Sequence, residues 1–343
     1  MAGTGPYVPG GATTNDELAE NGPDTTAEWI AEHTGIESRR WAAPGETTAV
    51  LATRAAKAAL EAAQVDAHDI DLVLLATSTP DWQTPATATA VHHALGLRLD
   101  AGALDLDAAC SSFVYALHVG ASMLAGGESW TNVLVIGADR ASSLTDPTDR
   151  STRILFGDGA GAVVLRKELE IADVVAMAAV DAGIDPGAAF DAGLDGGPLD
   201  DETPGLRSVT YTVDHTGLDA LVMPLGGTLE MDGPAVKTFA VAALVSAVGT
   251  ACQEAGIEVD DLDLLVPHQS NRRLIEAAID VVGLPESRCT FTVDELGNTG
   301  GASLPISLDV AHRDGRLRTG DLVCLAGYGA GLQSAACVLR WST

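Results

Sequence analysis

Apolar residues recur along the chain in two patterns: short continuous runs, and a period close to that of a helix. The run Asp69–Ser78 (DIDLVLLATS) predicts a strand buried on both faces. Apolar runs at 104–108 and 132–137 predict two more strands, and another follows the glycines after Phe156. Helical periodicity predicts helices at 27–34, 47–63, 86–95, 110–126 and 235–256. This alternation of strands and helices is typical of an α/β protein.

Two stretches have a weaker pattern. Glycine and proline cluster at 3–11, so residues 1–45 predict turns and a first strand that is cut short. The periodicity also fades between 169 and 227, where the Gly-, Asp- and Pro-rich segment 183–201 predicts a surface loop.

The second half of the chain repeats the first. In order, 261–266 (DLDLLV) matches 69–74 (DIDLVL), 320–327 (GDLVCLAG) matches 130–137 (WTNVLVIG), and 335–340 (AACVLR) matches 161–166 (GAVVLR). Three matches in the same order and at similar spacing predict two copies of one α/β unit. We therefore predict two halves, residues 1–170 and 171–343.

Composition narrows the possible partners. Apolar residues make up 46% of the 343 residues and aromatic residues only 4%, so the core is expected to consist mainly of Ala, Val, Leu and Gly. The net charge of -29 excludes nucleic acid and anionic membrane as partners. The longest apolar run, near 240–252, is too short to span a bilayer, and the N-terminus has no secretory pattern. We expect a cytoplasmic protein.

The five cysteines are widely spaced and include no C-x-x-C pair, so neither a disulfide framework nor a metal site is predicted. Cys110 differs from the others because it lies between a predicted strand end and a predicted helix start, in DLDAACSSFVYAL. Unpaired N–H groups and the helix dipole stabilise a thiolate at such a position. A catalytic nucleophile and a buried structural thiol both fit it.

The repeat indicates where a base and further donors lie. The counterpart of the Cys110 turn is 294–302, which contains Asn298, and the counterpart of the strand end at Thr77 is 267–271, which contains His268. Ligands of open α/β sheets bind beyond the carboxyl ends of the strands, so these residues are expected to face one cavity. Taken singly, His268 also fits a core or capping histidine, and Asn298 a turn residue.

A cysteine, a histidine and an asparagine in one cavity suit acyl-transfer chemistry. The thiolate of Cys110 attacks an acyl thioester and holds the acyl group covalently. His268 and Asn298 then act as neutral donors to the oxygen of an enolate that decarboxylation produces. The N–H of Cys110 and one from the turn at Gly329 and Ala330 are candidates for the oxyanion site of the acyl transfer.

The sequence resembles the 3-oxoacyl-[acyl carrier protein] synthase III (ketoacyl synthase III) family of the thiolase-fold superfamily. The matching pieces span the chain in the family's order: Glu28-Trp29-Ile30, Thr34-Gly35-Ile36, Ala108-Ala-Cys110, Asp146-Pro-Thr-Asp-Arg150, Phe156-Gly-Asp-Gly-Ala-Gly161, Val266-Pro-His268-Gln with Asn271, and Gly297-Asn298-Thr. The resemblance implies a homodimer whose subunits have a thiolase-like five-layered α-β-α-β-α fold made of two duplicated halves. It implies acyl-CoA and malonyl-acyl carrier protein as substrates, and no cofactor.

The resemblance also implies roles for single residues. Cys110 is the nucleophile that accepts the acyl group, and His268 and Asn298 assist decarboxylation and condensation. Four residues fall where the family contacts coenzyme A or its pantetheine arm, namely Thr25, Trp29, Arg150 and Asn271. Arg273 falls where the family meets the acidic carrier protein.

Departures from the family pattern leave alternatives open. His33 replaces a usual arginine, Pro234 and Lys237 replace Asn and Phe in the pantetheine channel, Ala330 and Ser334 alter the cavity floor, and Thr84 stands where a bulky residue often closes the acyl pocket. Decarboxylative condensation is the first hypothesis. In a second, the acyl group passes to an alcohol or amine without decarboxylation, and His268 is a general base. In a third, the chain is a catalytically silent partner subunit.

Overall fold

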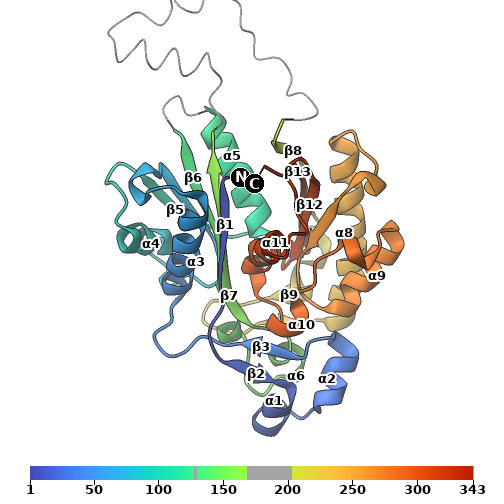
Figure 1. Cartoon of the computed structure of the whole chain (residues 1–343). Helices are drawn as coiled ribbons and strands as arrows, with labels where there is room; N and C mark the ends of the chain where they lie inside the picture. The colour runs from blue at the N-terminus through green and yellow to red at the C-terminus, as the bar shows by residue number, and fades with distance from the viewer. Residues whose placement is uncertain (127–129, 168–202, 343) are drawn as a thin grey trace, which may run out of the picture.

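The computed structural model describes residues 1–126, 130–167 and 203–342. Its elements form five layers, α-β-α-β-α, with two sheets on either side of a central helical layer (Figure 1). The predicted fold class is confirmed. The N-terminus lies beside the C-terminal strand end, where the Met1 ammonium donates to Ser342 Oγ at 2.6 Å.

The first sheet has the strand order β1-β7-β6-β4-β5. Its strands are β1 (Gly3–Tyr7), β4 (Leu72–Ala76), β5 (Gly102–Leu106), β6 (Asn132–Arg140) and β7 (Asp158–Arg166). β4 runs parallel to β5 and β6, whereas β7 pairs antiparallel with β6 and β1. Every residue of β4 is buried, as its continuous apolar run predicts, and β5 is a partly exposed edge strand.

The second sheet has the order β11-β12-β13-β8 in the described part of the chain. Its strands are β8 (Gly205–Val213), β11 (Leu264–Pro267), β12 (Leu322–Gly329) and β13 (Gln333–Arg340). β11 and β12 are parallel and β12 and β13 antiparallel, which repeats the arrangement of β4, β6 and β7. The duplication predicted from the three sequence matches is therefore present in the topology.

Helices α5 (Ser112–Gly126) and α11 (Ser303–Arg313) lie between the sheets, as Figure 1 shows. Phe113 and Leu117 of α5 and Leu304 and Leu308 of α11 share one buried cluster with apolar residues of both sheets. α3 (Thr48–Ala63) and α4 (Thr87–Leu95) cover the outer face of the first sheet, and α8 (Gly233–Glu254) and α9 (Arg272–Val282) lie outside the second (Figure 1). Both helices are therefore packed between the two sheets. α5 begins two residues after Cys110, and α11 begins five residues after Asn298.

Shorter elements surround the sheets. They are β2 (Ala12–Thr14), β3 (Ser38–Arg40), β9 (Leu221–Val222), β10 (Glu230–Met231), α1 (Asn15–Asn21), α2 (Ala27–Thr34), α6 (Arg150–Arg153) and α10 (Val293–Leu296). Single 3-10 turns are η1 (Ala67–Asp69), η2 (Ala141–Leu144), η4 (His215–Ala220), η5 (Val259–Asp261), η6 (Glu286–Arg288) and η7 (Gly300–Ala302).

The expectation that the first strand is cut short is wrong. Gly3–Tyr7 forms β1, which pairs along its whole length with β7. Its glycines serve close packing here, because a Cβ on Gly3 would lie 2.4 Å from Ala63 N and one on Gly5 would lie 2.2 Å from Ala59 N. The same residues that suggested a turn therefore let α3 lie directly on the strand.

The expectation that no apolar segment is long enough to span a bilayer is also corrected. In the described residues, Ala109–Gly126 and Gly233–Glu254 have the length and hydropathy of a spanning helix. Both are packed in the fold, since α5 lies between the sheets and α8 packs on the second sheet, with Leu244, Val248 and Cys252 buried there. Their apolar character is that of core helices.

Two further expectations concern the middle of the chain. The proposed boundary between residues 170 and 171 and the surface loop 183–201 lie outside the described residues. Within the weakly patterned stretch, Gly205–Val213 forms strand β8, which the periodicity did not reveal. Only some of its residues are buried, so its sequence carries little of the apolar signal of a central strand.

Candidate active site

The turn between β5 and α5 presents Cys110. Ala109, directly before it, has φ +50°, a left-handed conformation that costs energy for a residue with a Cβ. Three hydrogen bonds hold the turn: Ala109 N–H donates to Asp107 Oδ1 at 2.9 Å, and the N–H and hydroxyl of Ser112 donate to Ala109 O at 3.0 and 2.5 Å. The strained turn aims the thiol away from the strand and into a cavity.

His268 directly follows β11, and its N–H continues the parallel pairing by donating to Ala326 O at 2.7 Å. Nδ1 lies 2.7 Å from Ser303 Oγ, at the start of α11. The ring of Tyr328 meets the imidazole edge-on, with centroids 5.3 Å apart. Burial lowers the pKa of His268 to about 3, so the imidazole is neutral at physiological pH.

Asn298 lies between α10 and η7, held by its backbone on both sides. Its N–H donates to Leu155 O at 2.7 Å and its carbonyl accepts from Gly157 N–H at 2.9 Å. The side-chain Oδ1 accepts from Gly300 N–H at 2.9 Å. This bond fixes which end of the carboxamide points outward, and Nδ2 has no hydrogen-bond partner within the described residues.

The structure brings Cys110, His268 and Asn298 together on the wall of one cavity of about 520 Å³. They come from both halves of the chain, as the repeat predicts. Of the five cysteines, Cys110 is the one that is partly exposed, whereas the other four are buried. A thiol that reaches a cavity fits a nucleophile better than a structural role.

The expectation of a resting thiolate at Cys110 is corrected. Burial raises the pKa of Cys110 to about 12, and the charges of Asp139 and Asp107 add to the rise. These effects oppose the helix N-terminus, so the resting site holds a neutral thiol beside a neutral imidazole. Attack by sulfur therefore requires that the thiol proton moves to a base.

Gly329, at the end of β12, lies against the Cys110 turn. A Cβ on Gly329 would lie 2.7 Å from Cys110 N and 3.0 Å from Ala109 Cβ. Glycine alone therefore leaves the Cys110 N–H accessible from β12. Gly329 lines the main cavity, whereas Ala330, the other residue predicted for the oxyanion site, lines a second one.

That second cavity has a volume of about 390 Å³ and shares Cys110 and Phe156 with the first. Leu144, Leu221, Val222, Met223 and Leu229 make much of its wall apolar. The thiol thus stands between two spaces, one that leads to Trp29 and one lined by aliphatic side chains together with Asp107 and Asp139.

Aromatic and basic side chains line the outer part of the main cavity. The guanidinium of Arg150 lies over the Trp29 ring, 4.6 Å from its centroid. The imidazole of His33 also stacks on Trp29, with ring centroids 4.1 Å apart. Asn271 donates from Nδ2 to His33 O at 3.3 Å. These residues, with Lys237, form a mixed flat and cationic surface that suits a nucleotide and its phosphates.

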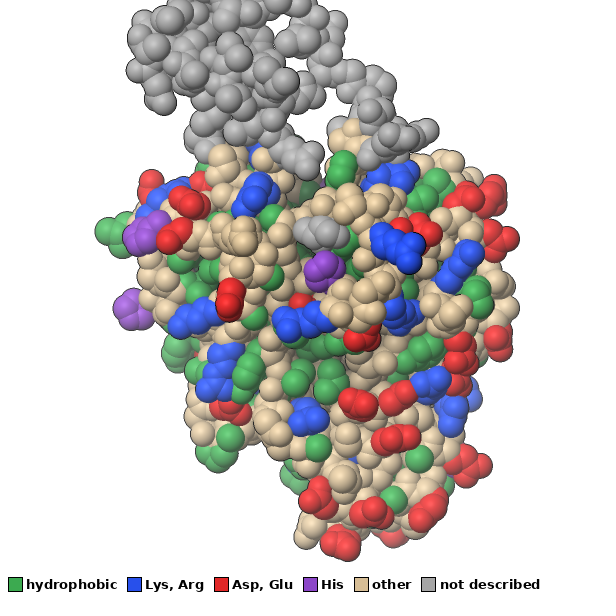
Figure 2. All heavy atoms as spheres, in the orientation of Figure 1, with side chains coloured by type: hydrophobic (Ala, Val, Ile, Leu, Met, Phe, Trp, Pro, Cys, Tyr) green, Lys and Arg blue, Asp and Glu red, His purple; other side chains and the backbone are tan. Residues whose placement is uncertain are grey.

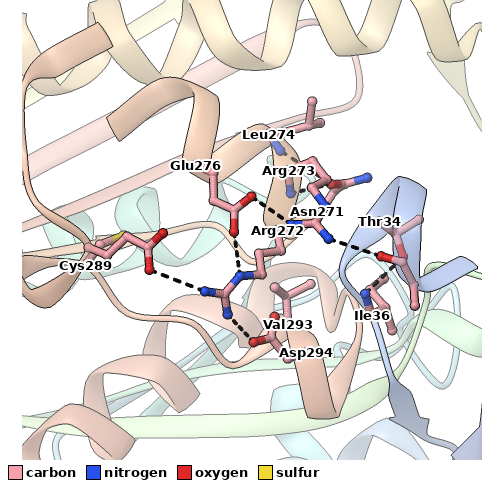
Figure 3. A network of polar contacts seen from close by, with 12 residues as sticks. Thr34, Ile36, Asn271, Arg272, Arg273, Leu274, Glu276, Cys289, Val293 and Asp294 are labelled. Atoms are coloured by element: carbon pink, nitrogen blue, oxygen red, sulfur yellow. Dashed lines mark hydrogen bonds and ion pairs between the residues drawn. The ribbon is translucent and has the colours of Figure 1, made fainter. Parts of the chain in front are cut away.

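The adjacent arginines Arg272 and Arg273 have different surroundings (Figure 3). Arg272 bonds Glu276 at 2.7 Å, Glu286 at 3.5 Å and Asp294, so its charge is neutralised inside the protein. Arg273 pairs with Glu276 at 3.0 Å, keeps 48% of its side chain exposed and lines the main cavity. Of the two, Arg273 is the one placed to meet an anionic partner.

Thr25 is the one predicted substrate contact that the structure does not bring to the cavity. It is not among the lining residues, and its hydroxyl is buried without a hydrogen-bond partner in the described part of the chain. A buried hydroxyl does not reach coenzyme A, so the expectation for Thr25 is not supported. Across the same described residues, no group of three or more His, Cys, Asp or Glu side chains is arranged to hold a metal ion.

Ser303 was not predicted, although it orients His268. It lies five residues beyond Asn298, where a glycine-rich turn enters a helix, and a hydroxyl at a helix start near a strand-end histidine is the only signal the sequence offers. That signal becomes specific only once the two segments are known to touch.

Comparisons with known proteins agree with this geometry. The model of the 3-oxoacyl-[acyl-carrier-protein] synthase III family matches residues 104–183, and that of its C-terminal part matches 252–341. The beta-ketoacyl-[acyl-carrier-protein] synthases III of Rhizorhabdus wittichii and Sinorhizobium medicae are 44% and 42% identical to this chain. Each alignment covers 99% of the chain and 98% of the relative.

Solved structures show the same relationship. The synthase III of Aquifex aeolicus superposes with a TM-score of 0.86 at 33% identity, covering 99% of both chains. The priming beta-ketosynthase of the R1128 polyketide pathway superposes with a TM-score of 0.85 at 36% identity, covering 100% of this chain and 96% of the other. The chain belongs to the 3-oxoacyl-[acyl carrier protein] synthase III family and is an acyltransferase of the condensing type.

Proposed function

We propose that the protein loads a short acyl group from coenzyme A onto Cys110 and condenses it with malonyl-acyl carrier protein, at the start of a fatty acid or polyketide chain. Membership of the synthase III family supports the activity. The observation that carries the residue roles is the meeting of Cys110, His268 and Asn298 at one cavity. A catalytically silent subunit would have no need to keep these three groups together.

In the loading step, the Cys110 sulfur attacks the thioester carbonyl while its proton passes to Nε2 of His268, in the tautomer whose Nδ1–H donates to Ser303 Oγ. The negative oxygen of the tetrahedral intermediate accepts from the Cys110 N–H, beside Gly329. The bond from the carbonyl carbon to the coenzyme A sulfur then breaks, and the leaving thiolate takes the proton from His268. A neutral imidazole, which the low pKa of His268 ensures, is the form that can accept this proton.

In the condensation step, the bond between the malonyl carboxylate and its α-carbon breaks and carbon dioxide leaves. The enolate oxygen that forms accepts from His268 Nε2–H and Asn298 Nδ2–H. This requires the other tautomer of His268 from the one used in loading, with Nδ1 accepting from the Ser303 hydroxyl, and the 2.7 Å contact permits both. The α-carbon attacks the acyl-Cys110 carbonyl, the carbon–sulfur bond breaks, and the Cys110 thiolate takes up a proton.

The outer residues suggest how the substrates are held. We assign the adenine and phosphates of coenzyme A to the surface made by Trp29 and Arg150, and the pantetheine arm to the channel past Asn271. Arg273 provides the positive charge that an acidic carrier protein would meet. The second cavity, whose wall includes several aliphatic side chains, would take the acyl chain.

We propose a homodimer that forms through β5. This strand is the outer edge of the first sheet, and Leu104 on it keeps 36% of its surface exposed, with Trp82 nearby in the chain at 50%. An open strand edge with apolar side chains is a template for pairing with another strand. Light scattering on the purified protein should give twice the chain mass, and Leu104→Arg should give a monomer. A wild-type monomer would refute this part of the proposal. We further propose a cytoplasmic location.

The decisive experiment follows the acyl group and the carbon dioxide separately. Incubation with acetyl-CoA should add one acetyl mass to the intact protein, and Cys110→Ala should abolish it. Cys252→Ala is the matched control, because Cys252 is buried on α8 away from the cavity and should leave loading unchanged. Release of labelled carbon dioxide from malonyl-carrier protein should depend on His268 and Asn298.

The same assay separates the competing hypotheses. Asn298→Ala should load acetyl at a measurable rate and lose condensation by about a hundredfold or more. An acetylated enzyme that releases no carbon dioxide and turns over only with an alcohol or amine would replace condensation by simple acyl transfer. Failure to acquire any acyl mass would favour the silent subunit.

A further inference from the structure

Asp139 is a buried carboxylate that the mechanism above does not use. It lies near the end of β6 with only 2% of its surface exposed. Its Oδ1 accepts from Ser78 N–H at 2.8 Å and from the hydroxyls of Thr77 and Thr79, each at 3.1 Å. Its Oδ2 accepts from Gly301 N–H at 2.7 Å. All four donors are neutral, and together they solvate the ionised form of Asp139.

The contact through Oδ2 reaches the turn that carries Asn298. Gly300 N–H donates to Asn298 Oδ1, and the next N–H, that of Gly301, donates to Asp139. Gly300 has φ +60°, and a Cβ on it would lie 2.4 Å from Asp139 Oδ2. The carboxylate therefore packs against one glycine of the turn and binds the other. It fixes the peptide directly after the one whose N–H binds the Asn298 carboxamide.

The internal repeat gives this contact a counterpart. The match of 130–137 with 320–327 makes Asp139 equivalent to Gly329, just as Asn298 is equivalent to Cys110. In one copy the end of β12 leaves the Cys110 N–H accessible, because Gly329 has no side chain. In the other copy the end of β6 carries the carboxylate of Asp139, which binds Gly301 N–H three residues beyond Asn298. Asn298 N–H itself, the counterpart of Cys110 N–H, donates to Leu155 O.

We propose that Asp139 is a positioning residue for the condensation half-reaction, which acts by holding the Gly300–Gly301 turn so that Asn298 donates to the enolate. This inference rests on the role of Asn298 in the proposed function. Asp139 has no direct part in the acyl transfer onto Cys110. Its negative charge raises the pKa of the Cys110 thiol, so neutralising it does not disfavour loading.

The fold gains no stability from the charge at neutral pH. Burial raises the pKa of Asp139 from 3.8 to about 6. A carboxyl whose pKa is raised by folding contributes stability that is complete below its unfolded pKa and is lost as the pH rises through its folded pKa. At pH 7.5 the ionised Asp139 therefore lowers the free energy of unfolding. Such a cost to stability is common for groups that serve function.

Few other charges act on this group. Asp107 and the Cys110 thiol, both in the turn before α5, are the titratable groups facing it, and Asp107 raises its pKa. The Thr77–Thr79 turn of β4 and the Gly300–Gly301 turn before α11 present neutral donors. A loss of condensation at acid pH that loading does not share would therefore indicate protonation of Asp139.

The test compares loading and condensation in Asp139→Asn. Acetyl loading, followed by intact mass, should stay within about threefold of wild type, while carbon dioxide release and product formation fall by about ten- to a hundredfold. The melting temperature at pH 7.5 should change little, because the relief from removing a buried charge offsets the lost bond from Gly301 N–H. Asp139→Glu, which restores a carboxylate beside the second cavity, should recover part of the condensation rate. In the wild type, condensation alone should decline below about pH 6, and Asp139→Asn should lack this decline.

Asp309→Asn is the matched control. Asp309 on α11 is also a buried carboxylate. It accepts a hydrogen bond from Thr4 on β1, pairs with Arg313, and does not line either cavity. Loading and condensation should keep their wild-type ratio in this variant. The inference is overturned if Asp139→Asn lowers both half-reactions together with the melting temperature, or if it condenses normally. If Asn298→Ala also condenses normally, the proposed function has failed instead. Should Asp139→Asn not fold, the wild-type pH series still decides.

Discussion

Gly329 illustrates how a single missing side chain governs chemistry at this site. Gly329→Ala would place a Cβ 2.7 Å from Cys110 N, where the oxygen of the loading intermediate is expected. Loss of one oxyanion donor typically costs about a hundredfold or more in rate. We expect the loading rate, measured as acetyl mass gained per unit time, to fall by about that factor, and the melting temperature to fall as well because the Cβ meets a backbone atom.

The matched control for that change is Gly249→Ala, in the interior of α8. No atom lies within 4 Å of a Cβ built on Gly249, so alanine fits without strain. Because alanine favours a helix over glycine by about 0.5–1 kcal/mol, this variant should be slightly more stable and load normally. Normal loading by Gly329→Ala would show that the Cys110 N–H is not part of the oxyanion site.

Ser303 offers a second residue-scale prediction. Ser303→Ala removes the hydroxyl 2.7 Å from His268 Nδ1, which sets the tautomer that donates from Nε2. A lost hydrogen bond of about 1 kcal/mol corresponds to roughly a fivefold change, so condensation should slow by about five- to tenfold. The measurement is the rate of carbon dioxide release with acetyl already on Cys110.

Ser307→Ala provides the comparison for Ser303. Ser307 lies one turn further along α11, where its hydroxyl bonds Thr292 Oγ1 at 2.8 Å and lines neither cavity. This variant should keep the wild-type rate of carbon dioxide release. Equal rates in the two serine variants would mean that Ser303 only stabilises the helix start.

At the scale of elements, small residues replace the aromatic packing that this chain lacks. Gly5→Ala would push a Cβ to 2.2 Å from Ala59 N, so β1 and α3 must separate. Overpacking of this kind typically costs about 1–3 kcal/mol. We expect urea denaturation to show a loss of that size, while Gly10→Ala, with open space around its Cβ, should leave stability unchanged.

At the scale of elements, the sequence predicted the duplication but not the contacts between elements. Three short matches were enough to predict two copies, and their register placed His268 and Asn298 opposite Cys110. The matches could not show that Gly3 and Gly5 belong to a strand, because their use depends on α3 lying against them. Nor could they separate Arg272 from Arg273, because that difference depends on carboxylates that folding brings close to Arg272. They could not predict a neutral thiol at Cys110 either, since burial is the main cause of its raised pKa.

At the scale of the whole molecule, charge acts in two opposite directions. The chain has 48 acidic and 19 basic residues, and Figure 2 shows acidic side chains gathered at the end where α1 and α2 lie. Asp16, Glu17, Glu28 and Glu32 are among them. Repulsion between them destabilises the compact state, whereas Arg150, Lys237 and Arg273 at the cavity mouth would attract the acidic carrier protein of the proposed function.

Salt should therefore stabilise the fold and weaken carrier docking in the same preparation. Raising KCl from about 0.1 to 1 M shortens the screening length from about 10 to 3 Å, which removes most repulsion between surface carboxylates. A relief of about 2 kcal/mol corresponds to a rise in melting temperature of roughly 3 °C for a chain of 343 residues, and NaCl should act alike. Over the same range the KM for malonyl-carrier protein should rise, and that for acetyl-CoA should rise less.

Arg273→Glu should raise the carrier KM at low salt and flatten its salt dependence without changing the melting curve. A melting temperature that falls with salt would show that the paired charges, and not the unpaired carboxylates, dominate the electrostatic free energy of this molecule.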